Sequence, residues 1–180
     1  MRERPRGAKA PAPKVEVLIQ SVLWKSEAKI AARLRAAITA AAARLGEGDA
    51  PCPVTPMPSA PSRALLALAL SDDEAVRALN RDWRSKDKPT NVLSFPAATP
   101  GTSARGPVHW GDVIIAYETT AREAEEAGKS FADHAAHLAV HGFLHLAGYD
   151  HEKDIDAEVM EGLERAILAR IGIPNPYSET

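Results

Sequence analysis

The sequence has 180 residues, of which 45% are hydrophobic, and a formal net charge of −2 at pH 7. This length predicts one domain with one core. The charge balance excludes a protein that binds nucleic acid through an overall basic surface, so contact with nucleic acid would need a local basic patch.

Cysteine content and hydropathy bear on the cellular compartment. Cys52 is the only cysteine, which excludes an intramolecular disulfide and a cysteine-based zinc cluster and fits a reducing cytosol. Residues 1–14 lack the apolar stretch of a secretory signal, and the longest apolar run, 64–70, is too short to cross a bilayer. We therefore expect a cytoplasmic protein without a membrane segment.

Composition also predicts the domain boundaries. Residues 1–14 are rich in Arg, Lys and Pro and predict a disordered basic tail. We expect residues 15–173 to form a single domain, followed by a C-terminal tail over 174–180. Inside the domain, a run of prolines predicts a loop over residues 51–61, because proline does not continue regular structure. These prolines are Pro51, Pro53, Pro56, Pro58 and Pro61.

Strands and helices alternate in the first half of the chain. Alternating apolar residues predict a strand over 15–23, and apolar residues three and four apart predict a helix over 26–45. The apolar run 65–70 predicts a second strand. A second helix, with Ser71 or Asp72 as its cap, then runs to about residue 83.

The second half is expected to be mostly helical. A charged loop over 84–91 and short strands over 92–95 and 112–116 lead to a helix over 119–127. The next helix is capped by Ser130 and ended by Gly148. The last helix opens at Asp154, and its expected buried stripe is Ile155, Val159, Leu163, Ile167 and Ile171. This order of elements predicts an α+β or mixed α/β domain.

Histidines are concentrated between residues 137 and 151. The segment reads His-Leu-Ala-Val-His-Gly-Phe-Leu-His-Leu-Ala-Gly-Tyr-Asp-His. His141 and His145 are four residues apart, so a helix projects both from one face. Gly148 can adopt φ > 0 and turn the chain so that His151 returns to the same metal. Three imidazoles predict one zinc ion with an open fourth position, as in a catalytic site, and they also suit other transition metals.

Two neighbouring residues test this prediction. His137 shares the face of His141, but ligands at 137, 141 and 145 would span about 12 Å along a helix, too far for one zinc. We interpret His137 as a packing or supporting residue.

The histidine spacing equals that of the metzincin proteases, whose general base is the glutamate after the first histidine. Gly142 stands at that position, which indicates either close helix packing or room for substrate beside the metal.

The sequence resembles the YbeY family of bacterial endoribonucleases and ribosomal RNA maturation factors. Residues 141–151 resemble its zinc motif and read His-Gly-Phe-Leu-His-Leu-Ala-Gly-Tyr-Asp-His. Residues 79–96 resemble its second signature and read Leu-Asn-Arg-Asp-Trp-Arg-Ser-Lys-Asp-Lys-Pro-Thr-Asn-Val-Leu-Ser-Phe-Pro. Residues 111–115, Gly-Asp-Val-Ile-Ile, resemble the strand between them.

The resemblance carries implications for fold and function. It implies an α+β fold with a small mixed sheet, expected here as about four strands packed with about five helices. It also implies zinc held by three histidines and cleavage of single-stranded RNA. The implied role is maturation of the 3′ end of 16S ribosomal RNA and ribosome quality control, with the small ribosomal subunit and its assembly factors as partners. The family's functional arginine corresponds to Arg84.

Phosphodiester hydrolysis explains why these residue types belong together. Zinc would either activate a water, whose pKa it lowers towards ~7, or polarise the scissile phosphate. The phosphate also needs positive charge as the transition state forms. Arg84 can supply that charge, and Lys86 and Lys88 extend a local basic patch for the RNA backbone. Asp150 is a candidate for orienting a histidine. No residue is assigned as the general base.

Two other functions compete with RNA cleavage. A ribosome-assembly factor with a structural zinc would bind RNA without turnover, although structural zinc sites usually have four protein ligands and three are found here. A metalloprotease would cleave peptides, and Gly142 argues against it because a glycine cannot act as a base.

Overall fold

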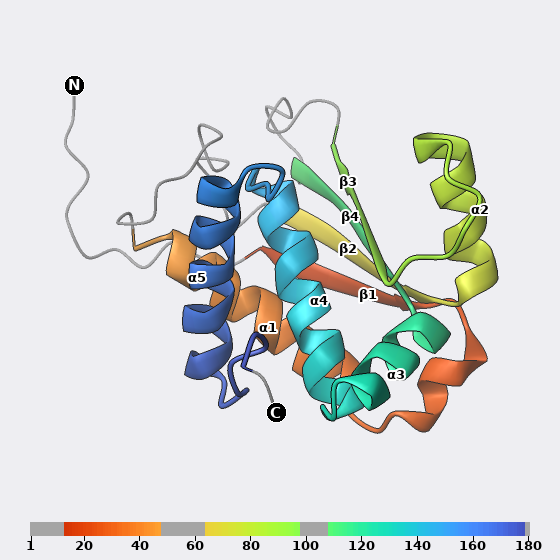
Figure 1. Ribbon diagram of the computed structural model, residues 1–180. Helices are drawn as coiled ribbons and strands as arrows, with labels where there is room; N and C mark the ends of the chain where they lie inside the picture. Colours follow the sequence, from red (N-terminus) through yellow and green to blue (C-terminus); the bar gives the residue numbers. More distant parts are fainter. Residues whose placement is uncertain (1–12, 48–63, 98–107, 179–180) are drawn as a thin grey trace.

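The computed structural model describes residues 13–47, 64–97 and 108–178 (Figure 1). The proline-rich stretch 51–61 and most of the expected N-terminal tail lie outside these residues. Lys14, placed in that tail from the sequence, is the first residue of a strand. In the described part of the chain, no helix is long and apolar enough to span a membrane.

The order of elements confirms an α+β fold with a helical C-terminal half. The described residues form a four-stranded sheet and five α-helices, with one short 3-10 helix. The elements are β1 (Lys14–Ile19), η1 (Val22–Ser26), α1 (Ile30–Leu45), β2 (Ala64–Ser71), α2 (Asp73–Arg84), β3 (Val92–Pro96), β4 (Val108–Ala116), α3 (Tyr117–Glu126), α4 (Phe131–Leu146) and α5 (Asp154–Arg170).

The sheet is mixed, with strand order β1-β2-β4-β3. β2 pairs in parallel with β1 and with β4, whereas β3 pairs antiparallel with β4. β2 is the most apolar strand, and it lies inside the sheet between β1 and β4 with most of its residues buried. β1 and β3 are therefore the two edges, and β3 is the edge that borders the histidine-bearing helix.

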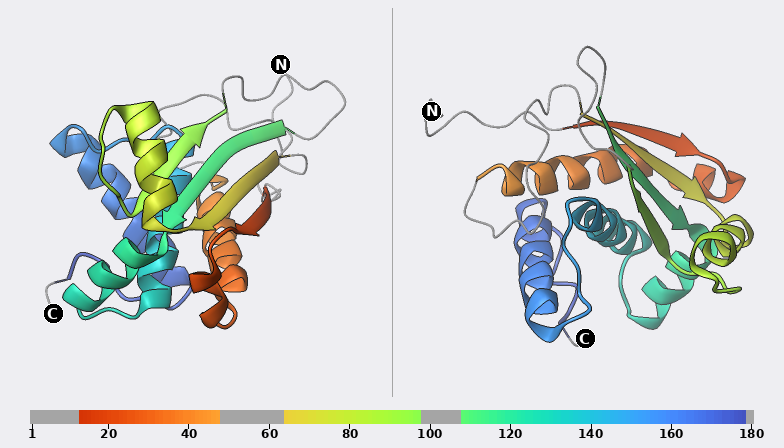
Figure 2. Two further views of the ribbon diagram at one scale, coloured as in Figure 1. Left: turned by 90° about the vertical axis from the view of Figure 1, so that its right-hand side faces the viewer. Right: turned by 90° about the horizontal axis from the view of Figure 1, so that it is seen from above.

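Helices cover the two faces of the sheet unequally (Figure 2). The main core lies on one face, where α1 and α4 pack against the sheet and α5 packs on α1 and α4. On the other face, Val76 of α2 packs with Leu93 of β3 and Ala116 of β4 in a second, smaller core. The edge strand β3 thus has α4 on one side and α2 on the other.

Two boundaries differ from the sequence prediction near the N-terminus. β1 ends at Ile19, and α1 begins at Ile30 because η1 and a turn occupy the residues between them. The Trp24 indole donates a hydrogen bond of 2.7 Å to the carbonyl of Ser71, which fixes η1 against the end of β2. Ser26 does not cap α1, because its hydroxyl donates back to the carbonyl of Leu23.

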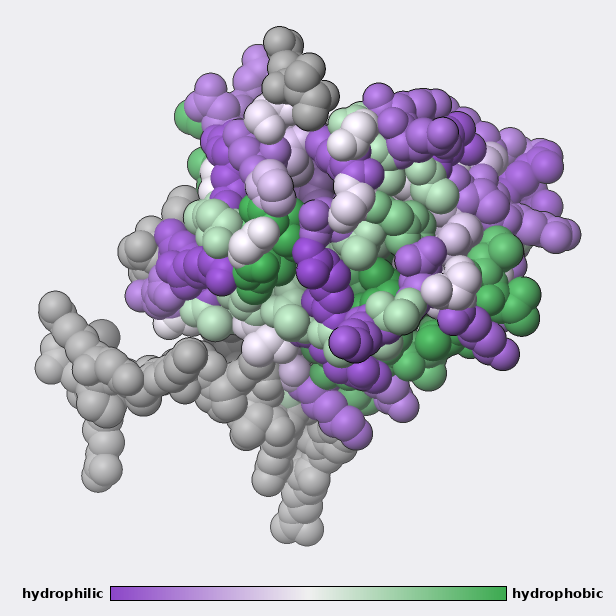
Figure 3. Space-filling view, turned by 90° about the horizontal axis from the view of Figure 1, so that it is seen from below, coloured by the Kyte–Doolittle hydropathy of each residue, from purple (hydrophilic) through white to green (hydrophobic). Residues whose placement is uncertain are grey.

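Apolar side chains are exposed along β1 and η1. Leu18, Ile19, Val22 and Leu23 are 44, 46, 70 and 37% exposed. Seen from below, apolar surface is concentrated at the side of the molecule where β1 and η1 lie (Figure 3). β1 is the edge of the sheet opposite β3.

The prediction of which residues of the last helix are buried is partly wrong. Leu163 and Ile167 are buried as expected, but Ile155 is 69% exposed, because the first turn of α5 is not covered. The buried residues of α5 are Met160, Leu163, Glu164, Ile167 and Leu168. A carboxylate therefore occupies the stripe, and it lies behind the histidine cluster.

Candidate metal centre

The C-terminal end of α4 creates the turn that assembles the histidines. Gly148 has φ +86°, as the sequence predicted, and follows the cap residue Ala147. The Gly148 N–H donates to the His145 carbonyl at 2.9 Å, and the Tyr149 N–H donates to the Leu144 carbonyl at 3.0 Å. This paired pattern is the Schellman motif, which requires a left-handed residue at its centre. It reverses the chain and returns His151 towards α4.

The three predicted ligands lie together in the structure. The nearest ring nitrogens of His141, His145 and His151 all lie within 4.8 Å of one another. The Nε2 atoms of His141 and His145 are 3.0 Å apart. The His151 ring centroid lies 5.3 Å from that of His141 and 5.0 Å from that of His145. This group could hold a metal ion, and no fourth His, Cys, Asp or Glu joins it among the described residues.

Hydrogen bonds at Nδ1 determine the tautomers of the two helical histidines. His141 Nδ1 lies 2.8 Å from Glu164 Oε1, and His145 Nδ1 lies 3.0 Å from the Tyr149 carbonyl oxygen. A carboxylate and a carbonyl only accept, so each Nδ1 carries the proton and donates. Each Nε2 is therefore left with a lone pair, which is the form that binds metal.

Two lone pairs that face each other at 3.0 Å repel unless a cation lies between them. Two nitrogens bound to one zinc at 2.0–2.1 Å with tetrahedral angles would be about 3.3 Å apart. The observed separation is close to that value. The donor set and the His141–His145 separation therefore fit one metal ion held by the three histidines.

Glu164, which was not predicted from the sequence, lies behind the histidines. Its side chain is fully buried, and its two oxygens accept from three donors. Oε1 accepts from His141, whereas Oε2 accepts from His137 Nε2 at 2.9 Å and from the Tyr177 hydroxyl. His137 therefore supports the site through Glu164 and is no ligand. The tail segment contributes as well, because Tyr177 follows the end of α5.

The pKa directions follow from this packing. Burial, then the nearby His141 and His151, lower the pKa of His145 to about 4, so the imidazole is neutral near pH 7. Burial alone would raise the pKa of Glu164, but hydrogen bonds from His137 and His141 outweigh it and lower the pKa to about 2. Burial and the bond to Glu164 raise the pKa of Tyr177. Glu164 is thus an ionised carboxylate behind the metal site.

Close packing accounts for Gly142. A Cβ on this residue would lie 2.6 Å from Val113 Cγ1 on β4, and the Gly142 carbonyl accepts from Ser94 Oγ at 3.1 Å. The missing side chain thus lets α4 approach the sheet. The second interpretation, that Gly142 leaves room for substrate beside the metal, is wrong because this face of α4 is buried against β3 and β4.

Asp150 does not orient a ligand ring. Its carboxylate accepts from the backbone N–H of His151 at 2.8 Å, so it holds the turn rather than an imidazole. The carboxylate expected behind a histidine is supplied by Glu164 instead.

Arg84 is the last residue of α2, and Lys86 and Lys88 lie in the turn that follows it, so none of the three is on the helix that carries His141 and His145. All three are exposed, and their side chains form no hydrogen bond or ion pair with any residue that the structure describes. Side-chain hydrogen bonds stabilise the turn. Asn80 donates to the Lys88 carbonyl at 2.8 Å, and Asp87 pairs in bidentate fashion with Arg77 at 2.8 and 2.9 Å.

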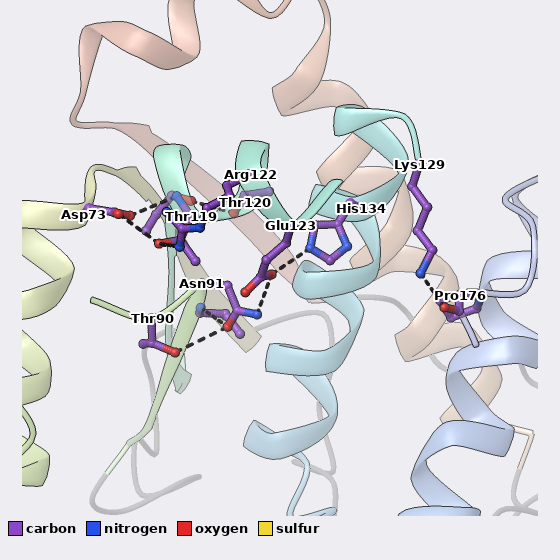
Figure 4. A network of polar contacts seen from close by, with 12 residues as sticks. Asp73, Thr90, Asn91, Thr119, Thr120, Arg122, Glu123, Lys129, His134 and Pro176 are labelled. Carbon is purple, nitrogen blue, oxygen red and sulfur yellow. Dashed lines mark hydrogen bonds and ion pairs between the residues drawn. The ribbon is translucent and has the colours of Figure 1, made fainter. Parts of the chain in front are cut away.

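A polar network fixes the start of β3 relative to α3 and α4 (Figure 4). Glu123 Oε2 accepts from Asn91 Nδ2 and lies 2.9 Å from His134 Nε2. The side-chain oxygen Oδ1 of Asn91 in turn accepts from the Val92 N–H at 2.7 Å. The basic turn and the histidine helix are therefore joined through one anchored strand.

Comparison with known proteins identifies the family. The family model described as endoribonuclease YbeY matches residues 55–172. The chain belongs to the YbeY family. An endoribonuclease YbeY of Rhodopseudomonas palustris strain BisB18 is 51% identical over 169 residues, covering 93% of this chain and 94% of the relative. One from Bradyrhizobium diazoefficiens is 49% identical and one from Chelativorans sp. is 44% identical, covering 93 and 95% of this chain and 86 and 97% of those relatives.

The YbeY family match includes all six residues predicted for the site, from Arg84 to His151. Among solved structures, one from Thermotoga maritima matches with a TM-score of 0.44 and 19% identity, covering 92% of this chain and 97% of that chain.

Proposed function

We propose that this protein is a zinc-dependent endoribonuclease that cleaves single-stranded RNA. The observation that carries the proposal is the convergence of His141, His145 and His151, with the free Nε2 atoms of the first two facing each other. Membership of the endoribonuclease YbeY family supports the same conclusion.

The chemistry of the donor set supports zinc. The three histidines would hold the ion, and Glu164 and the Tyr149 carbonyl would keep two of the rings in the metal-binding tautomer. A bound zinc ion supplies a Lewis acid and a water of lowered pKa at its open position. Neutral His145 is ready to bind at physiological pH, since its pKa is lowered to about 4.

Arg84, Lys86 and Lys88 would bind the RNA backbone. Their side chains have no acidic partner in the described chain, whereas the neighbouring Asp82 and Asp87 are paired with Arg81 and Arg77. A guanidinium binds phosphate oxygens in bidentate fashion and stays charged, so Arg84 is the residue we assign to stabilise the transition state. The two lysines would add contacts to phosphates along the strand.

We further propose that the RNA is the 16S RNA of the small ribosomal subunit. The proposed roles are maturation of its 3′ end and ribosome quality control, together with subunit assembly factors. The support for this step is the likeness of residues 79–96 and 141–151 to the YbeY signatures and the membership of that family.

Metal removal tests the proposed activity. Purified protein should cleave a defined single-stranded RNA, lose this activity after chelation, and regain it when stoichiometric zinc is added. A protein that binds the RNA tightly without cutting it in any metal state would instead be an assembly factor with a structural ion. Cleavage of peptides but not RNA would point to a protease. Gly142 argues against a protease, because it stands at the position of the protease's glutamate base and packs against Val113.

A further inference from the structure

Trp83 breaks the burial pattern of its own helix. Val76, Asn80 and Trp83 follow one another at spacings of four and three along the inward stripe of α2. Val76 is fully buried and Asn80 is 3% exposed, but Trp83 is 72% exposed. A tryptophan at a stripe position is expected inside the core, so its exposure calls for another explanation.

The surroundings of Trp83 combine an aromatic ring with unpaired positive charge. Its indole meets the ring of Phe95 on the edge strand β3, with the centroids 5.9 Å apart and an interplanar angle of 66°. Arg84 is the next residue, and Lys86 and Lys88 follow in the turn. We propose that Trp83 is a stacking platform for an unpaired base of the RNA substrate, an inference that rests on the proposed function.

The strand β3 lies between Trp83 and the helix α4 that carries two of the histidines. Ser94 on β3 donates to the carbonyl of Gly142, which lies between the two helical histidines. Phe95 is the next residue on the strand and faces the opposite side, where it meets Trp83. Since β3 is an edge of the sheet, an RNA strand that crosses this edge can stack a base on Trp83 and present a phosphate near the histidines.

Hydrogen bonds order the turn that follows Trp83. Ser85 adopts the left-handed conformation with φ 57°, and the Lys86 N–H donates to the Asn80 carbonyl at 3.2 Å. Together with the Asn80–Lys88 bond, these contacts fix the turn that follows Trp83. A tryptophan side chain has only two rotatable bonds, so it binds a base with little loss of side-chain entropy.

Stacking on Trp83 also explains a preference for single strands. A base is available to an aromatic side chain only when it is unpaired and unstacked from its neighbours, whereas phosphate contacts alone do not distinguish single from double strands in this way. The basic turn would give affinity, and Trp83 would select the unpaired strand.

The intrinsic fluorescence of the intact protein offers a direct test. Trp24 and Trp110 are 0 and 6% exposed, so a base that stacks on the protein can quench Trp83 and leaves the other two tryptophans shielded. The probe is a 2′-O-methylated RNA oligomer, in its normal form, in an abasic form with the same phosphates, and annealed to its complement. We expect quenching by the normal single strand and none by the abasic or duplex forms.

Binding by two variants completes the test. Trp83→Ala should weaken Kd for the normal single strand by about 5- to 150-fold, the range for losing one aromatic stack. Trp83→Phe should retain most of the affinity. The abasic strand should bind wild type and Trp83→Ala equally, because it has no base that could stack on Trp83. Thermal unfolding of each variant checks that the fold is intact.

Several outcomes would overturn the platform. These are binding of the normal strand without quenching, equal quenching by the abasic strand, or an unchanged Kd in Trp83→Ala. Cleavage of RNA by the wild-type enzyme is measured separately on an unmodified strand. If that cleavage is zinc-dependent while Trp83→Ala binds normally, the stacking role fails and the proposed function stands.

Discussion

His141 Nδ1 donates a hydrogen bond of 2.8 Å to Oε1 of the fully buried Glu164. A buried carboxylate is tolerated only when it is paired. Here the His141 N–H, the His137 N–H and the Tyr177 hydroxyl satisfy it. The consequence is a directed imidazole with Nε2 facing the ligand cluster and a negative charge behind it.

The first prediction concerns Glu164→Gln. The amide keeps the size of the side chain and one acceptor but removes the charge and adds donors towards groups that already donate. Loss of such a carboxylate behind a histidine ligand typically weakens metal binding 10- to 100-fold. We expect zinc affinity to fall by about that factor, measured by competition with a chromophoric chelator.

Glu158→Gln is the matched control for this change. Glu158 lies on the same helix, is exposed, and forms no hydrogen bond or ion pair with the part of the chain that the structure describes. The Glu158→Gln change removes the same negative charge but no hydrogen bond to a histidine, and it should leave zinc affinity unchanged. Equal affinities for both variants would show that Glu164 does not support the ligand.

The second prediction compares two helical glycines. Alanine at Gly142 would place Cβ 2.6 Å from Val113 Cγ1, a stiff β-branched side chain in the sheet, whereas at Gly162 Cβ would meet only Arg165 Nη2 at 3.8 Å. Overpacking should destabilise Gly142→Ala by about 1–3 kcal/mol. Gly162→Ala should gain about 0.5–1 kcal/mol from helix propensity. Urea denaturation gives both values, and a stabilised Gly142→Ala would mean that α4 does not lie so close to β4.

The third prediction concerns acid and the metal-free protein. Unfolded histidine has a pKa near 6.5, whereas burial lowers the pKa of His145 to about 4 in the fold. The unfolded chain therefore binds a proton first, and stability is lost as pH falls from about 6.5 to 4. The free energy of unfolding of chelated protein should decline across this range. In His145→Gln this part of the decline should be absent, and an identical pH profile in the variant would refute the assignment.

The fourth prediction separates Arg84 from metal binding. Because its guanidinium would act on the phosphate, Arg84→Ala should lower kcat/KM for RNA by about 100- to 1000-fold, the usual loss for one transition-state donor. Zinc content per chain should not change. Arg81→Ala, one turn earlier, removes an arginine already paired with Asp82 at 2.8 Å and should have a far smaller effect. Comparable losses in both variants would indicate general charge attraction only.

Much of the fold and the ligand set follow from local sequence rules. Asp72 accepts from the Ala75 N–H and Ser130 accepts from the Asp133 N–H, so both predicted helix caps are present. Gly148 takes the predicted positive φ because the Schellman turn needs it. Such signals act within a few residues and do not depend on the rest of the chain.

The support behind the ligands depends on packing between distant elements. Glu164 lies 23 residues after His141, and nothing local shows that α5 faces α4. One signal was available, since Glu164 falls between Met160 and Ile167 at helical spacing and so occupies a stripe position. An acidic residue there, opposite a helix with two extra histidines, marks a buried polar contact. The position of Arg84 across β3 likewise required the sheet order.

The most direct test of the account is RNA cleavage by wild type and His145→Ala purified in parallel. His109→Ala is the control, since His109 is 45% exposed and lies outside the ligand group. We predict zinc-dependent cutting of a defined single-stranded RNA by wild type and His109→Ala, and none by His145→Ala, which should also lose its zinc. Cutting by His145→Ala at the wild-type rate would contradict the account, because the activity would then not depend on the histidine site.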